Sequence, residues 1–308
     1  MSEKIKPTNA ATEPKQMTLT VQSANELVLG IAGSGTVTID WGGGMPRETH
    51  RLEEFDFIDY CCGGCGSVFH ENEFTSFCMA YGYGNCEWKV KSDNNEQICT
   101  KKFVNKYKFR GHSAGTITIT GEKITHLSFS SINLTNLDVG NNLELIWLEC
   151  CENYLTSIDI RKNTALEFLN CQDNQLTHLD VSTNISLIEL FCSDNLLTNL
   201  DVSKNTALEC LNCKNNQLTH LDVSANTELT NLCCTNNQLT NLNLRNNTKL
   251  EFLNYNGNQF ADVDISANEL IYSLNGYMWL NPKKWRSIKE RNVIYFPSEE
   301  NDEEVCPF

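Results

Sequence analysis

This 308-residue sequence lacks both a long apolar run and a cluster of basic residues. No apolar stretch approaches the roughly 20 residues that span a bilayer, so a transmembrane helix is not expected. Lysine and arginine occur at most as short pairs such as Lys101-Lys102, while the formal net charge is −15. Because phosphate backbones and anionic lipids repel an acidic chain, we expect no nucleic-acid partner and no membrane insertion.

The first 16 residues also lack the apolar core of a secretory signal peptide. We expect a disordered N-terminus over residues 1–16 and an acidic tail over residues 298–308. The lack of a signal peptide favours a cytoplasmic location. A leader removed from the natural protein would instead indicate a secreted or surface protein, and the sequence leaves both localisations open.

The middle of the chain repeats every 21 residues from about residue 124. One unit reads LEFLNCQDNQLTHLDVSTNIS (166–186), and the next reads LIELFCSDNLLTNLDVSKNTA (187–207). The recurring columns include Leu148, Leu169, Leu190, Leu211, Leu232, Leu253 and Leu274; Cys150, Cys171, Cys192, Cys213 and Cys234; and Asn153, Asn174, Asn195, Asn216, Asn237 and Asn258. Alternating apolar residues share one face of a strand, and a single unit cannot bury that face unless units stack.

The pattern L-x-x-L-x-C-x-x-N-x-L resembles that of leucine-rich repeat proteins. It predicts a mainly β fold, a right-handed solenoid over residues 122–275 with short turns or 3₁₀ pieces on its convex side. The asparagines are expected to satisfy backbone groups at the turns, since an amide both donates and accepts. The cysteine column is interpreted as buried free thiols, because parallel neighbouring side chains give poor disulfide geometry.

The N-terminal part reads as β-strands at residues 17–22, 26–33 and 35–40, with a turn at residues 41–44 and a further strand pair within residues 106–121. Its T-x-T-I-D-W-G-x-G segment resembles a PKD-type (Ig-like) β-sandwich, and together with the repeats it is similar to leucine-rich repeat proteins of Bacteroides-type bacteria. The resemblance implies a small β-sandwich-like domain over residues 17–121. After the repeats, residues 276–297 are expected to form a cap with a short helix, beginning at Asn281-Pro282, and a final strand.

A cysteine-rich insert, residues 51–102, interrupts the N-terminal domain. Its cysteines suit three interpretations: free thiols, disulfides in an oxidising compartment, or a zinc site. No metal or other cofactor is expected, and zinc is the alternative; its weak candidate ligands are Cys62, Cys65, Cys78 and Cys86. No protease or transferase motif surrounds any cysteine, so we expect no enzymatic activity.

The candidate site is the concave face of the solenoid, where aromatic, amide and carboxylate side chains alternate with the buried leucines. The predicted ligand-binding residues are Trp147, Glu149, Phe168, Asn170, Glu189, Phe191, Asn212, Phe252 and Asn254. Exposed aromatics of this kind are typical of protein interfaces, although cross-strand packing would also explain them. The sequence therefore favours a monomeric, non-catalytic protein-binding module with an unidentified protein partner. The alternative is a secreted or surface-associated adhesion protein that contacts glycans.

Overall fold

The computed structural model describes residues 14–22, 26–52, 88–91, 96–99, 108–112, 115–261, 263–271, 273–274 and 277–278. Within these ranges every regular element is a β-strand. None of the described residues forms a helix with the length and apolarity needed to cross a membrane. The predicted cap helix and most of the cysteine-rich insert lie outside the described residues.

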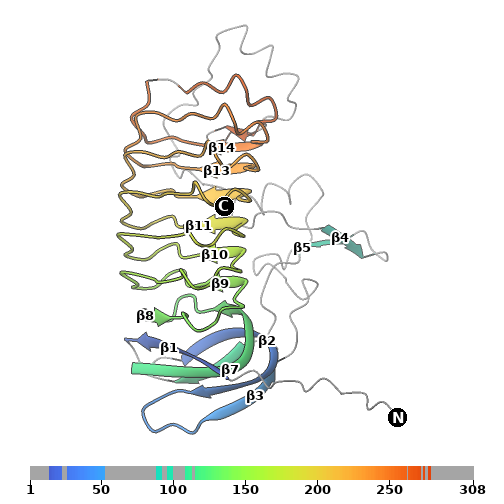
Figure 1. Ribbon diagram of the computed structural model, residues 1–308, viewed down its shortest axis with the longest axis vertical. Helices are drawn as coiled ribbons and strands as arrows, with labels where there is room; N and C mark the ends of the chain where they lie inside the picture. Colours follow the sequence, from blue (N-terminus) through green and yellow to red (C-terminus); the bar gives the residue numbers. More distant parts are fainter. Residues whose placement is uncertain are drawn as a thin grey trace, which may run out of the picture.

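Each 21-residue repeat supplies one three-residue strand, and the strands stack in parallel along the molecule (Figure 1). They are β9 (Trp147–Glu149), β10 (Phe168–Asn170), β11 (Glu189–Phe191), β12 (Cys210–Asn212), β13 (Asn231–Cys233) and β14 (Phe252–Asn254). The register places equivalent repeat positions side by side, so Leu169 pairs with Leu148 and Leu190. Turns connect the strands on the convex side. The predicted leucine-rich repeat solenoid is confirmed.

The solenoid core consists of the repeat leucines and the cysteine column. The cysteines of this column are fully buried and free, as predicted: Cys150, Cys171, Cys192, Cys213 and Cys234. Burial raises the pKa of Cys171 and of Cys213 to about 12, so both remain neutral thiols. Each fully buried leucine stabilises the folded chain by roughly 1.5–3 kcal/mol because it leaves water. A single repeat has no neighbouring repeat to bury its leucines, so it cannot fold alone.

Two asparagine ladders hold successive turns together. In the first, the Nδ2 atom of Asn195 donates to the carbonyl oxygens of Cys171, Cys192 and Ser193 at 3.0, 3.3 and 3.0 Å. Its Oδ1 atom accepts from the backbone N–H of Leu176 at 2.9 Å.

The second ladder lies on the convex side, where Nδ2 of each asparagine donates to two backbone carbonyls of the preceding repeat. Its members in successive repeats are Asn163, Asn184, Asn205, Asn226, Asn247 and Asn268. Both ladders satisfy buried backbone groups at the turns, as the sequence predicted.

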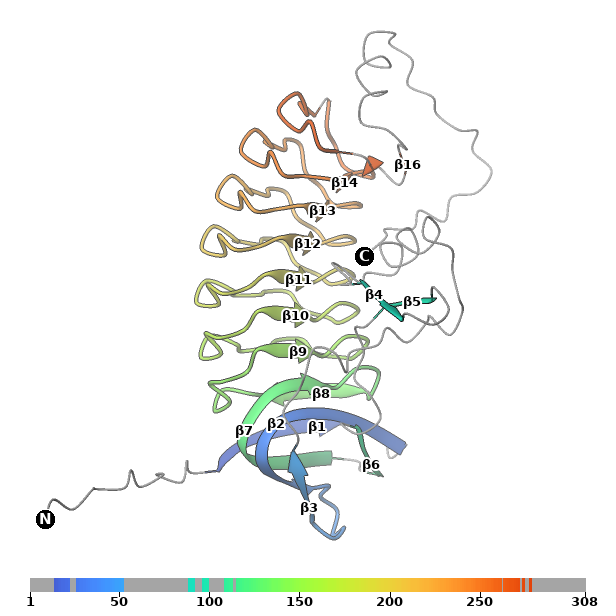
Figure 2. The same cartoon turned by 90° about the vertical axis from the view of Figure 1, so that its right-hand side faces the viewer.

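The N-terminal strands belong to the same 14-stranded sheet as the repeats. They are β1 (Lys15–Val21), β2 (Glu26–Asp40), β3 (Glu48–Leu52), β6 (Lys108–His112), β7 (Gly115–Ser128) and β8 (Leu134–Asp138). Strand β7 pairs antiparallel with β1 and β2 and parallel with β9. Buried side chains of these strands form one hydrophobic core with the repeats. The long strands therefore cover the first end of the solenoid (Figure 2).

Several N-terminal details differ from the prediction. The two strands expected at residues 26–33 and 35–40 form one strand, β2, whose register against β7 shifts near Gly33 and Gly35. A Cβ at Gly33 would lie 2.0 Å from the Lys123 carbonyl oxygen, and Gly35 has a φ of 86°, so glycine permits the bend that keeps β2 continuous.

The strand pair expected within residues 106–121 is also absent as a pair, because β6 and β7 each pair with β2 instead of with each other. In the insert, β4 (Trp88–Lys91) and β5 (Glu96–Cys99) form a separate antiparallel sheet. At the opposite end, β15 (Ser273–Leu274) continues the parallel stack and β16 (Tyr277–Met278) pairs antiparallel with it. The PKD-type sandwich and the Bacteroides affiliation stay predictions.

Candidate binding face on the parallel sheet

The strands of the solenoid present three rows of side chains on the face opposite the leucine core, here called the concave face. The first row is Trp147, Phe168, Glu189, Cys210, Asn231 and Phe252, and the second is Glu149, Asn170, Phe191, Asn212, Cys233 and Asn254. The third row, just beyond the strands, is Cys151, Gln172, Ser193, Lys214, Thr235 and Asn256. All nine predicted site residues lie in the first two rows. The structure thus brings them together on one face.

The prediction that the aromatic residues are exposed is wrong. Trp147 and Phe168 are 5% and 8% exposed, and Phe191 and Phe252 are each 1% exposed. The carboxylate of the first row, Glu189, is also buried.

Ring stacking between neighbouring strands explains part of this burial. The Trp147 and Phe168 rings lie 3.4 Å apart with an interplanar angle of 3°, and the Phe168 and Phe191 rings lie 5.5 Å apart at 44°. Strand spacing of about 4.8 Å favours such contacts. Stacking covers ring faces but not their outward edges, so further contacts must cover this face.

Amides of the second row hold the backbone of the third row. Asn170 and Asn212 each accept, through Oδ1, the backbone N–H two residues later, at 3.2 and 3.1 Å. Asn254 repeats this contact at 3.4 Å, and its buried Nδ2 atom has no partner among the described residues. The amide oxygens of these asparagines therefore hold the adjacent backbone in place, while the Nδ2 group of Asn254 remains able to donate a hydrogen bond.

Next to the aromatic stack lies His126, on β7. Its ring stacks on Trp147 at a centroid distance of 6.5 Å, and Nδ1 lies 2.9 Å from the Thr125 hydroxyl. Burial lowers the pKa of His126 to about 4, so the ring is neutral at pH 7. A neutral, buried imidazole extends the apolar part of the face by one strand.

Three cysteines lie on the concave face, and they differ in state. Cys151 and Cys210 are buried and form no disulfide. Cys233 takes part in a disulfide. Cys151 donates to the Ser130 hydroxyl at 3.1 Å, and burial raises the pKa of its thiol to about 12. Sequence reasoning interpreted Cys210 and Cys233 as drift from the repeat consensus and gave no signal for the disulfide.

The zinc alternative concerns Cys62, Cys65, Cys78 and Cys86, which lie outside the described residues. Within the described ranges, no group of three or more His, Cys, Asp or Glu side chains is arranged to hold a metal ion. The zinc site stays an untested prediction.

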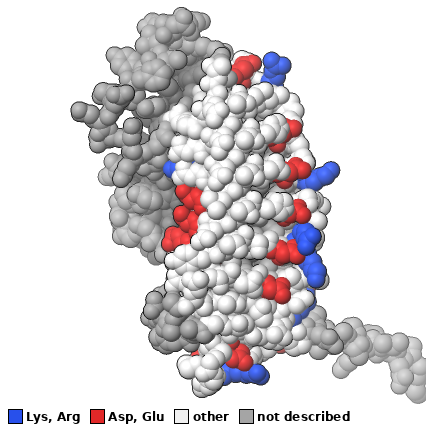
Figure 3. Space-filling view, turned by 90° about the vertical axis from the view of Figure 1, so that its left-hand side faces the viewer, with Lys and Arg blue, Asp and Glu red and all other residues white. Residues whose placement is uncertain are grey.

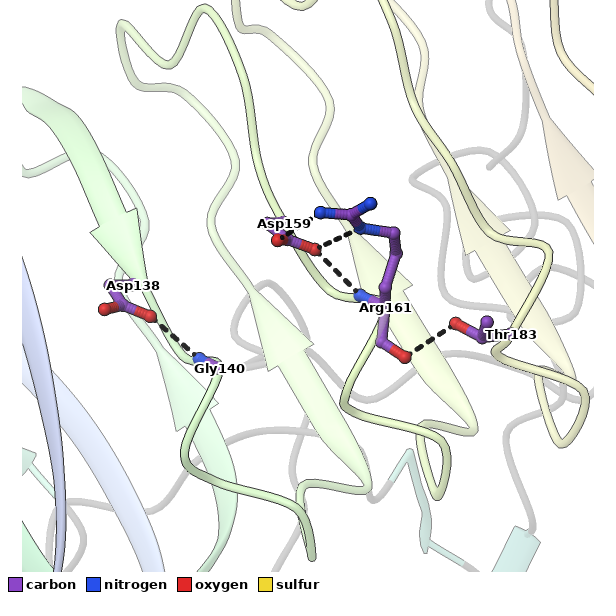
Figure 4. A network of polar contacts seen from close by, with 5 residues as sticks. All are labelled: Asp138, Gly140, Asp159, Arg161 and Thr183. Atoms are coloured by element: carbon purple, nitrogen blue, oxygen red, sulfur yellow. Dashed lines mark hydrogen bonds and ion pairs between the residues drawn. The ribbon is translucent and has the colours of Figure 1, made fainter.

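Aspartates of the convex turns accept hydrogen bonds from the backbone. Asp138 accepts the N–H of Gly140 at 2.9 Å, and Asp159 accepts that of Arg161 at 3.1 Å (Figure 4). The side-chain hydrogen bond from Arg161, and then its backbone N–H, lower the pKa of Asp159 to about 2. These carboxylates recur along the stack beside a broad uncharged strip (Figure 3). They are turn residues, each bonded to its own turn.

A second acidic column was not anticipated. Glu152, Asp173 and Asp194 occupy the same left-handed turn position in successive repeats, with φ between 51° and 55°. Burial, followed by the charges of Asp194 and Glu152, raises the pKa of Asp173. Asparagine, which adopts this conformation readily, occupies the position at Asn215 and Asn236. The signal available in the sequence was the change at this position from Glu and Asp in three repeats to Asn in the next two.

No known protein-family profile and no curated protein matches this chain. Solved structures with a similar fold include an internalin, InlF, from Listeria monocytogenes, at 25% identity over 44% of each chain with a TM-score of 0.42. A leucine-rich repeat protein from Leptospira interrogans aligns at 25% identity over 41% of this chain and 38% of its own, with a TM-score of 0.39. The functional domain of InlJ from Listeria monocytogenes, which includes a cysteine ladder, aligns at 25% identity over 51% and 53%, with a TM-score of 0.25. The chain thus spans about half or less of each of these structures.

Proposed function

We propose that this chain is a non-catalytic protein-binding module whose concave face binds an extended peptide segment of a partner protein. The observation that carries the proposal is the aromatic cluster of Trp147, Phe168 and Phe191, in which the first two rings stack and the third is tilted, flanked by amides and few charges. Interface centres have this composition, with aromatic residues enriched and charged residues depleted. An extended peptide fits a row of short strands because its side chains alternate along the same direction.

A peptide suits this face better than a glycan does. Sugars stack on exposed ring faces, whereas the ring faces here are covered by neighbouring rings or by further contacts. A peptide side chain can pack on the outward edges of the rings, and the unused Nδ2 donor of Asn254 can meet a carbonyl oxygen. A partner must displace the contacts that cover the face in the isolated chain.

We propose a non-catalytic role because the cysteine at the edge of the face, Cys151, lacks the features of a nucleophile. The thiol of Cys151 has a raised pKa and hydrogen bonds to a serine hydroxyl instead of a base. A cysteine nucleophile requires a thiolate, which a lowered pKa or an adjacent base supplies. Neither condition holds for Cys151, which sits at the edge of the face.

Selection of phage-displayed random peptides on the immobilised, reduced chain tests this function. A selected peptide is then synthesised and titrated against the wild type, Phe168→Leu and the matched control Ile185→Ala. Ile185 is 61% exposed on a convex turn. We expect Phe168→Leu to weaken binding about tenfold, the loss typical of an aromatic residue at an interface centre, and Ile185→Ala to leave binding unchanged. Equal affinity for both variants, or failure to enrich any peptide, would refute the proposal.

A further inference from the structure

The core side of the parallel sheet carries a column of thiols, here called the thiol column, with one member from each of five successive repeats. Its members are Cys150, Cys171, Cys192, Cys213 and Cys234, all fully buried and none in a disulfide. Phe129 occupies the equivalent position before the column and Tyr255 the position after it, so the row of sulfur atoms ends at an aromatic ring on each side. The column lies on the opposite side of the sheet from the concave face, so what it binds is independent of the function proposed above.

Backbone hydrogen bonds hold the column at the spacing of a parallel sheet. The N–H of Cys150 donates to the carbonyl oxygen of Asn170 at 2.8 Å, and the equivalent bond recurs at the other four cysteines of the column. Parallel strands lie about 4.8 Å apart, and equivalent side chains leave neighbouring strands in the same direction. Burial, followed by the charges of Cys171 and Cys213, raises the pKa of Cys192, which agrees with thiols that are direct neighbours.

This separation is too long for a disulfide but matches a metal ion held between two sulfur atoms. A disulfide requires sulfur atoms about 2.05 Å apart. A metal–thiolate bond of about 2.3 Å, the value for zinc, places two sulfur atoms about 4.6 Å apart when the ion lies on the line between them. Side chains stand roughly perpendicular to a sheet, so an ion within the column approaches each sulfur across its Cβ–Sγ bond, where a lone pair lies.

The geometry selects the kind of ion. Zinc requires four ligands at the corners of a tetrahedron, and side chains that project in one direction from a single column cannot surround it. Calcium and magnesium require oxygen ligands. Soft thiol ligands favour Cu(I), which accepts two ligands in a line. The thiol column therefore suits a soft monovalent ion, and it needs only two protein ligands for each ion.

Charge and valence set the number of ions. The residues packed around the column are apolar, and a net charge among them is costly. A Cu(I) ion that displaces one proton from two thiols leaves a neutral complex of ion, thiolate and thiol, and the proton passes to the solvent. The lone pairs of one sulfur atom do not point in opposite directions, so each sulfur holds one ion. Five thiols thus form two pairs, with one thiol left over.

We propose that the thiol column binds two Cu(I) ions, each held in line between the thiols of two successive repeats. Each ion links repeats that are otherwise joined by core packing and by the asparagine ladders, so binding stabilises the folded solenoid. Two pairs of neighbours can be chosen in three ways, and the thiol left over is then Cys150, Cys192 or Cys234. It is never Cys171 or Cys213, which every arrangement uses.

Counting bound copper in two cysteine variants tests this pairing. The reduced full chain is refolded from urea without oxygen in the presence of Cu(I), supplied as its acetonitrile complex, so that the closed core does not limit entry. Unbound ions are removed by gel filtration, and native mass spectrometry counts the copper that remains. Cys171→Ala leaves Cys150 without a neighbouring thiol and one pair among the other three, so we expect one ion fewer than in the wild type.

Cys192→Ala is the matched control. It removes an equally buried thiol of the same column but leaves the pairs Cys150–Cys171 and Cys213–Cys234, so we expect as many ions as in the wild type. Cysteines outside the column are the same in all three proteins, so any copper that they bind cancels in the comparison. Circular dichroism checks refolding, and Cys213→Ala, which also leaves one pair, replaces Cys171→Ala if that variant does not refold. Equal copper counts in the wild type and Cys171→Ala, or an equal loss in both variants, would overturn the proposal.

Discussion

Replacing one asparagine of the first ladder tests how the solenoid is held together. Asn195 makes four hydrogen bonds to backbone groups through one buried side chain. Asn195→Ala leaves the Leu176 N–H and three carbonyl oxygens without this partner. A buried group left unsatisfied costs roughly 1–3 kcal/mol. Some of these carbonyls can recruit water in the vacated space, so we expect a total loss of about 3–5 kcal/mol.

Urea unfolding followed by circular dichroism, with reductant present throughout, measures this loss. The matched control is Leu196→Ala, because Leu196 is the next residue and is 44% exposed. Its replacement should cost less than about 0.5 kcal/mol, as for surface substitutions. A domain of ordinary stability has only about 5–15 kcal/mol in total, so the ladder variant should unfold at clearly lower urea. A loss from Asn195→Ala as small as that of the control would refute the role assigned to the ladder.

Three further predictions concern groups whose environment is unusual. Burial raises the pKa of Cys171 to about 12 from an ordinary value near 9.0. Between these two values the unfolded chain loses the thiol proton while the folded chain keeps it, so the unfolding free energy should fall as the pH rises from 9 toward 12. Replacing Cys171 with Ala should reduce the slope of unfolding free energy against pH. Asp173→Asn should stabilise the chain by a few tenths of a kcal/mol at pH 7, since the raised pKa of Asp173 indicates that its negative charge is unfavourable in the folded state. In urea titrations of both proteins, this gain should vanish as the pH falls toward 3.8, because the carboxyl group of the wild type then becomes protonated. Gly111→Ala should cost about 1–3 kcal/mol in thermal unfolding, because its Cβ would lie 2.4 Å from the Trp41 ring.

The repeat could be predicted in detail because its evidence is local and periodic. The column containing Leu148 and Leu169 predicted where each short strand lies, and the asparagine columns predicted the turn contacts that the structure shows. A 21-residue spacing that returns the same residue types leaves no other register for the strands. The free state of the core cysteines followed from the same parallel geometry.

The state of the concave face could not be predicted, because it depends on contacts between segments far apart in the sequence. The pattern placed Phe168 and Phe191 correctly on one face, but not their burial, which requires stacking and further covering contacts. The disulfide of Cys233 had no signal in the repeat pattern. The continuity of β2 through Gly33 and Gly35 was missed because glycines usually end strands.

The most direct test of a peptide-binding concave face is protection of Cys210 from alkylation by a bound peptide. The reduced chain is treated with N-ethylmaleimide with and without saturating amounts of a peptide selected on it, and the tryptic fragment 205–214, which holds both Cys210 and Cys213, is quantified by mass spectrometry. A bound peptide that covers the first row should slow modification of Cys210 about tenfold, by blocking access to the thiol, and leave Cys213 unmodified in both cases. An unchanged rate at Cys210, with the peptide demonstrably bound, would place the binding site elsewhere and contradict the account.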